Sequence, residues 1–127
     1  MGLPAAKQGD QIVAIDFHIV VPPSPPPVTV PLPFNGIIDN NLSADVNIMG
    51  MPAAVEGSTA TNTPPHIPPG GAFQKPPSNK GTIKMGNSSV FINGKAAARA
   101  TDLAETCNDP MDLPVGQVIA QGTVLFG

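Results

Sequence analysis

The placement of proline constrains this chain more than any other feature. Proline accounts for 17 of 127 residues, and the segment 22–33 reads PPSPPPVTVPLP. Proline fixes φ and has no N–H to donate, so this segment can form neither a helix nor a central strand. It favours an extended polyproline-type arm. Glycine occupies 13 further positions, so the composition predicts short strands joined by long irregular loops.

The rest of the composition predicts that residues 1–127 fold as one domain. Hydrophobic residues make up 41% of the chain and charged residues only 12%, whereas disordered chains are rich in charge and poor in apolar residues. Tryptophan and tyrosine are absent, and five phenylalanines leave little aromatic area to bury. Because the core is thin, we expect stabilisation by a metal ion, by a partner surface, or by both.

Charge and hydrophobic patterning exclude several classes of partner. The net charge is −3, and the six basic residues form no cluster that would bind nucleic acid. No apolar run approaches the roughly 20 residues of a membrane-spanning helix, so we expect no stable membrane insertion. Residues 1–10 lack the pattern of a signal peptide, which predicts synthesis in the cytoplasm. The single cysteine, Cys107, leaves no internal disulfide.

Short segments rich in β-branched residues predict the strands. The first, residues 11–21, reads QIVAIDFHIVV and places Asp16 and His18 on one face, since alternate residues of a strand share a face. A second irregular stretch, residues 59–80, is rich in proline and glycine and contains His66. The only candidate for a helical turn is LAETC, residues 103–107. Further strand-like runs are residues 42–50, 81–86, 88–94 and 118–127.

An internal repeat is the strongest organisational signal. Residues 46–55, VNIMGMPAAV, align without gaps on residues 90–99, VFINGKAAAR, and match at Val, Ile, Gly and the Ala-Ala pair. Residues 118–127 and 9–21 repeat the rhythm of strand and glycine more loosely. Quasi-repeated hairpins in so short a chain predict a compact body with approximate internal rotational symmetry.

The repeats and several longer blocks resemble the PAAR-domain proteins, the cone-shaped tips of type VI secretion systems and related phage-like contractile injection particles. The Pro-Ala-Ala-Arg tetrad of that family is divided between the two repeats, because residues 52–55 lack the arginine and residues 96–99 lack the proline. The other blocks are GDQIVAIDFHIV, NTPPHIPPGG, FQKPPSNKGTI, VFINGK with AARATD, and TCNDP. Together they cover most of the chain.

This resemblance implies an all-β fold, a small cone or pyramid of short strands with long proline-rich loops and quasi-three-fold internal repeats. It also implies a non-enzymatic protein that caps and sharpens the trimeric β-helical spike of an injection system, with one tip per trimer. Such a tip helps to pierce the target envelope and can carry effectors. It would leave the cytoplasm as part of the particle and reach the outside or the target cell on firing.

The resemblance further implies one zinc ion bound by His18, His66 and Cys107. Without the resemblance, the absence of CxxC or HExxH spacing favours the ordinary reading, in which they are a strand histidine, a loop histidine and a buried thiol. Relatives of this branch carry a further histidine before Pro-Phe-Asn-Gly, where this chain has Leu32. A structural zinc requires four ligands. The fourth would therefore be water, an oxygen of a residue such as Asp16 or Asp109, or absent.

Two other functions start from the same residues. A zinc-dependent hydrolase would use two histidines and one cysteine with an open fourth position, but Glu56 and Glu105 are not spaced to serve as its base. The second is an adaptor that binds a toxin without being fused to it. Identifying the protein with which this chain co-purifies discriminates among these functions.

Overall fold

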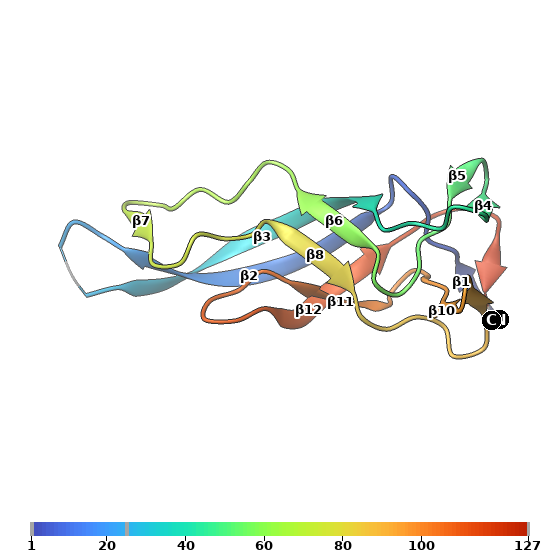
Figure 1. Cartoon of the computed structure of the whole chain (residues 1–127). Coiled ribbons are helices and arrows are strands. Elements are labelled where there is room, and N and C mark those ends of the chain that lie inside the picture. Colours follow the sequence, from blue (N-terminus) through green and yellow to red (C-terminus); the bar gives the residue numbers. More distant parts are fainter. Residues whose placement is uncertain (1, 25, 127) are drawn as a thin grey trace.

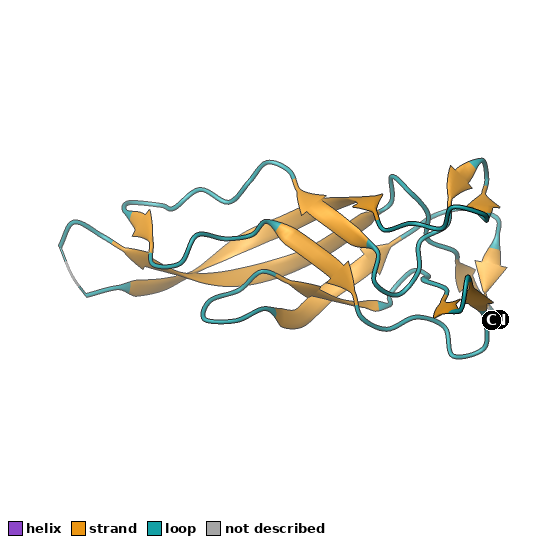
Figure 2. Ribbon diagram, in the orientation of Figure 1, coloured by secondary structure: helices purple, strands orange, loops and turns teal. Residues whose placement is uncertain are grey.

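The computed structural model describes residues 2–24 and 26–126 and is all-β, as predicted (Figures 1 and 2). Strands and isolated β-bridges together make up about 51% of the described residues. No described residue is helical, so this part of the chain contains no membrane-spanning helix. The strands are β1 (Leu3–Pro4), β2 (Gln11–Val21), β3 (Val28–Asn40), β4 (Asn47–Ile48), β5 (Met51–Pro52), β6 (Thr59–Asn62), β7 (Ala72–Phe73), β8 (Lys80–Ile83), β9 (Phe91–Ile92), β10 (Lys95–Ala96), β11 (Leu103–Thr106), β12 (Leu113–Ile119) and β13 (Leu125–Phe126).

Six strands close into a barrel, in the order β2, β3, β6, β8, β11 and β12, because β12 also pairs with β2. Every neighbouring pair is antiparallel. The barrel interior is filled by aliphatic side chains and one aromatic ring, which suits a sequence poor in aromatic residues. Its fully or almost fully buried members include Ile12, Phe34, Ile38, Ala60, Ile83, Ala104 and Val118.

Three Ala-Ala pairs at one end of the barrel are joined in a ring of hydrogen bonds. The N–H of Ala6 donates to the carbonyl of Ala98, that of Ala98 to Ala54, and that of Ala54 to Ala6. All three N···O distances are 3.0 Å, and all three alanines are fully buried. Three backbones approach this closely only when the side chains between them are small. The ring is a local three-fold arrangement within one chain.

The third copy of the repeat is assembled from both ends of the described chain. The N–H groups of Ala5, Ala53 and Ala97 donate to the carbonyls of Val124, Val46 and Val90, each at 2.9 Å. β1 accordingly pairs with β13 in the way that β4 pairs with β5 and β9 with β10. The looser copies expected in residues 9–21 and 118–127 therefore had the wrong boundaries. No contiguous segment could align on this copy.

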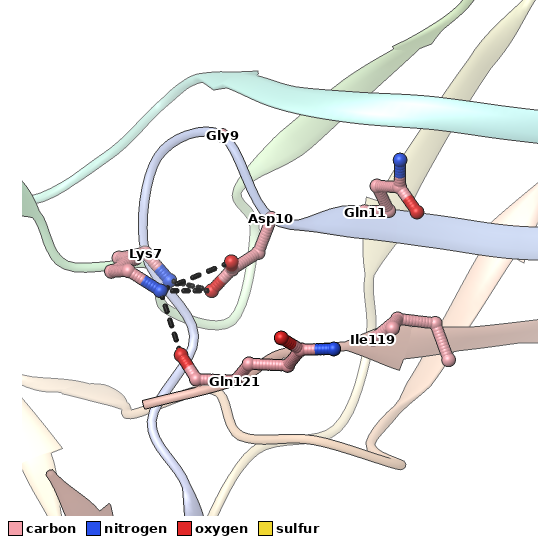
Figure 3. A pocket seen from close by; sticks show the side chains of 6 residues that line it. All are labelled: Lys7, Gly9, Asp10, Gln11, Ile119 and Gln121. Carbon is pink, nitrogen blue, oxygen red and sulfur yellow. Dashed lines mark hydrogen bonds and ion pairs between the residues drawn. The ribbon is translucent and has the colours of Figure 1, made fainter. Parts of the chain in front are cut away.

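Each Ala-Ala pair is followed by a turn. The residue directly after the pair donates its N–H to the side chain of the residue three positions further on. In the first copy the N–H of Lys7 donates to the Asp10 carboxylate at 3.0 Å, and Lys7 Nζ reaches the same carboxylate and the carbonyl of Gln121 (Figure 3). The equivalent bonds run from the N–H of Val55 to Ser58 Oγ and from the N–H of Arg99 to Asp102 Oδ2. The three turns thus share one geometry with different side chains.

Two segments differ from the sequence expectation. Residues 28–33 were expected to form an arm but belong to β3. This part of β3 pairs only with β2, so its prolines lie on a strand edge, where the absence of an N–H is tolerated. Residues 103–106, expected as a helical turn, form β11 between β8 and β12. Pairing with two neighbours overrides the weak helical preference of this run. The run 42–50 contributes only the two residues of β4.

Candidate metal centre

The three predicted ligands come from the three segments that follow the Ala-Ala pairs along the chain, and they meet inside the molecule. His18 lies in β2, His66 in the segment between β6 and β7, and Cys107 directly after β11. Asp16, also in β2, joins them. One donor atom from each of the four side chains lies within 4.8 Å of the others, and the group is buried. The three predicted ligands, at least 41 positions apart in the sequence, therefore converge on one point.

The alternation of β2 explains why Asp16 and His18 both face this point. Asp16 is 0% exposed and His18 is 1% exposed, whereas Phe17 between them is exposed. The backbone of Phe17 also bonds outward, because its N–H donates to Asn108 Oδ1 at 2.7 Å and its carbonyl accepts from Asp109. The segment that carries Cys107 is thereby tied to β2.

The two oxygens of Asp16 have different surroundings. Oδ1 accepts hydrogen bonds from the Thr106 hydroxyl and the Asn108 amide. Oδ2 lies 2.9 Å from His66 Nε2 and 3.5 Å from Cys107 Sγ. One oxygen is therefore held by neighbouring polar groups while the other faces the cluster. Such supporting hydrogen bonds orient metal ligands in proteins.

His66 is positioned by asparagines although it lies in a proline-rich loop. Its N–H donates to Asn79 Oδ1 at 2.9 Å, and its Nδ1 lies 3.3 Å from the amide nitrogen of Asn62. The side chain is only 3% exposed. The prolines on either side restrict the backbone, and the asparagines fix the direction of the ring. The loop thus presents His66 to the interior.

Burial changes the protonation of two of these groups. Desolvation, followed by the neighbouring His66, lowers the pKa of His18 below its usual value, so its imidazole is neutral at pH 7. Desolvation, followed by the charge of Asp16, raises the pKa of the Cys107 thiol to about 11. His18 Nδ1 is buried without a hydrogen-bond partner among the described residues. Two imidazoles, a sulfur and a carboxylate oxygen are the donor types that zinc binds, and they fit such an ion.

Comparison with known families identifies the chain. The sequence profile of the PAAR motif matches residues 34–106, which is more than half of the chain. The chain is a PAAR-motif protein. Members of this family are structural components of secretion and contractile injection systems and associate with a spike complex. A comparison with curated proteins found no match.

In this PAAR protein, Leu32 stands at the position where the resemblance implies a histidine, and it lies on the same β-ladder as Asp16. Leu32 is the direct partner of Asp16 in the register of β2 and β3, so their side chains share one face of the sheet. Leu32 contributes only carbon atoms at this position. Of the two carboxylates considered from the sequence, Asp16 lies in the cluster and Asp109 does not.

Sequence reasoning did not single out Thr106 and Asn108. Both flank Cys107 in the run Thr106-Cys107-Asn108, and both are buried. The signal available in the sequence was the pair of polar residues on either side of a candidate ligand, because such groups require partners when they are buried. The structure shows that their shared partner is Asp16.

We expect metal affinity to rise with pH because the thiolate is the metal ligand. Cys107, with a pKa of about 11, is protonated at neutral pH, so binding there releases its proton. Below the pKa, loss of one proton makes the apparent affinity rise about tenfold per pH unit, and it falls by the same factor on acidification. Competition against a chromophoric chelator at pH 7, 8 and 9 measures this slope. A flat profile would contradict ligation by Cys107.

Proposed function

We propose that this PAAR protein is a non-enzymatic tip that caps a trimeric β-helical spike, one copy per trimer, and sharpens it for penetration of a target envelope. The observation that carries the proposal is the ring of three hydrogen bonds among Ala6, Ala54 and Ala98. A single chain can match a three-fold partner only if its own base is approximately three-fold. The ring and the three strand pairs around it provide such a base.

We call the end formed by the strand pairs β1–β13, β4–β5 and β9–β10 the basal face. It lies at the end of the molecule that holds β1 (Figure 1) and carries exposed apolar side chains. Each pair, or the turn that joins its strands, contributes at least one large apolar residue: Leu125, Met49 and Phe91 are 54%, 55% and 62% exposed. Aromatic residues and methionine are enriched in protein interfaces. Short two-stranded pairs also leave unpaired edges that a further strand can cover. These features support docking on the blunt end of a β-helix.

The stoichiometry and the basal face can be tested together. Native mass measurement of the tip mixed with its spike is expected to give three spike chains and one tip. Phe91→Asp should weaken binding by about tenfold or more, because it places a charge in an apolar contact. Val115→Asp, at an exposed position in β12 outside the basal face, is the matched control and should bind normally. A complex with three tips, or equal effects of both variants, would refute this assignment.

We further propose that one zinc ion binds His18, His66 and Cys107, with Asp16 as the fourth ligand. When bound, the ion supplies a cross-link between the three segments that follow the Ala-Ala pairs, and it thereby makes this part of the molecule more rigid. The buried donor set supports a structural role, since a catalytic zinc keeps an open position. Neither Glu56 nor Glu105 belongs to the buried cluster of metal ligands. Glu105 instead forms an ion pair, in which its Oε1 lies 3.8 Å from Lys84 Nζ. Elemental analysis of protein purified without added metal should give about one zinc per chain.

A further inference from the structure

Two cavities border the buried donor cluster, and each is lined by different members of it. The first, which we call the polar cavity, has a volume of about 170 Å³ and is lined at its floor by His18 and Cys107. Its exposed rim includes Lys75, Ser78 and Asp112. The rim belongs to the segment between β7 and β8 and to the loop between β11 and β12 (Figure 1). Two of the candidate ligands therefore lie at the floor of a cavity with a solvent-exposed rim.

The second cavity, which we call the apolar groove, has a volume of about 390 Å³ and is lined by His66. Its walls include Leu32, Pro64, Pro65 and Ile67, and its lining contains no Asp, Glu, Lys or Arg. Moving a hydrated cation along such a surface is unfavourable, because its water would be removed without polar groups to replace it. Of the two cavities, the polar one is the more favourable path for a metal ion.

The polar cavity contains groups that can replace the water of an ion in steps. Asp112 supplies a carboxylate at the rim, and carboxylate oxygens are ordinary zinc ligands. At the floor, His18 is 1% exposed, and its Nδ1 has no hydrogen-bond partner among the described residues. A cavity of this volume has room for several water molecules, since one needs only about 10–15 Å³. An ion can thus exchange water for protein ligands as it moves inward.

The charge of Asp112 acts across this cavity. Burial, followed by the charge of Asp16, is the main reason that the pKa of Cys107 rises to about 11, and Asp112 adds to the rise. A negative charge that favours the proton on this thiol also attracts an approaching cation. Lys75 opposes the attraction, and its Nζ donates to the carbonyl of Pro110 at 3.1 Å. The rim therefore carries one attractive and one repulsive charge.

We propose that the polar cavity is the route by which a metal ion reaches and leaves the buried cluster, with Asp112 as the first group to bind it. The inference rests on the proposed metal site and deepens it, because it assigns residues outside the ligand set that determine how fast the metal exchanges. Uptake and release cross the same barrier along one route. An obstacle on that route therefore slows both and leaves the affinity unchanged.

Stopped-flow mixing of Co²⁺ with the full chain, first stripped of metal, tests the route, because cobalt–thiolate absorption reports arrival at Cys107. Ser78→Phe places a ring at the rim of the polar cavity. It should slow Co²⁺ uptake, and release from the loaded protein to excess chelator, by about tenfold each. Ile67→Phe is the matched control, because it enlarges a side chain of the apolar groove that is 74% exposed, and both rates should stay unchanged.

The charges at the rim provide a second arm of the test. Asp112→Asn should slow Co²⁺ uptake by about threefold at low salt, and Lys75→Gln should speed it by a similar factor. Raising salt from about 0.02 to about 0.5 M should reduce both differences, since salt screens exposed charges.

Three results would overturn the route and leave the metal site intact. They are equal slowing in Ser78→Phe and Ile67→Phe, a change in uptake without a matching change in release for Ser78→Phe, and uptake that neither rim charge affects. Failure of the unsubstituted chain to bind Co²⁺ would instead refute the metal site, and the route with it.

Discussion

Removal of the metal should lower the melting temperature of this protein by about 15 °C. A ligand present at a thousand times its dissociation constant stabilises the folded state by about 4 kcal/mol. In a domain of this size each kcal/mol corresponds to roughly 4 °C. The ion would join His18, His66 and Cys107, which lie in three segments far apart in the sequence, so its loss should loosen the whole part of the molecule that these segments form. Differential scanning calorimetry with and without a strong chelator measures the change.

Single substitutions separate the contributions of three of the four side chains. His66→Ala or Cys107→Ser should abolish most of the metal-dependent stabilisation, and Asp16→Asn should weaken metal binding by about 10 to 100-fold. Asp39→Asn is the matched control, because this exposed carboxylate in β3 is outside the cluster and its loss should leave both metal content and melting temperature unchanged. A folded protein that contains no transition metal and melts at the same temperature with chelator would refute the metal assignment.

Enlarging a side chain in the alanine ring should destabilise the fold by about 3 kcal/mol, or roughly 12 °C in melting temperature. Ala54→Leu adds three carbon atoms where the residue is fully buried and three backbones meet. The neighbours are backbone groups of the other two repeats, which cannot move apart without breaking the ring. We expect the same variant to lose spike binding, because the three-fold geometry of the basal face depends on this ring.

A second substitution tests the three-fold relation without enlarging the ring. Ala96 occupies the position that Pro4 and Pro52 occupy in the other two copies. Ala96→Pro should therefore fold normally and be neutral or stabilising by about 0.4–1 kcal/mol, since proline restricts the unfolded chain. Thermal unfolding of both variants provides the comparison. A strongly destabilised Ala96→Pro, or an Ala54→Leu that melts normally, would contradict equivalence of the three copies.

The sequence alone predicted the β-rich class and the contiguous part of the repeat, because both depend on local properties. Proline density excludes helices wherever it occurs, and the runs 46–55 and 90–99 are each complete within one segment. The resemblance to the PAAR family, and not residue type or spacing, singled out His18, His66 and Cys107. The structure brings these three together, and their role as zinc ligands stays a prediction.

Tertiary structure alone decided what depends on segments far apart in the chain. The third copy is formed by β1 and β13, which no contiguous alignment can find. Asp16, and not Asp109, lies in the buried cluster, and Thr106 and Asn108 donate hydrogen bonds to one of its carboxylate oxygens. Pairing also made strands of residues 28–33 and of LAET, where local preference pointed elsewhere. Local sequence limits the backbone, but hydrogen bonds and burial between distant segments select which permitted conformation is formed.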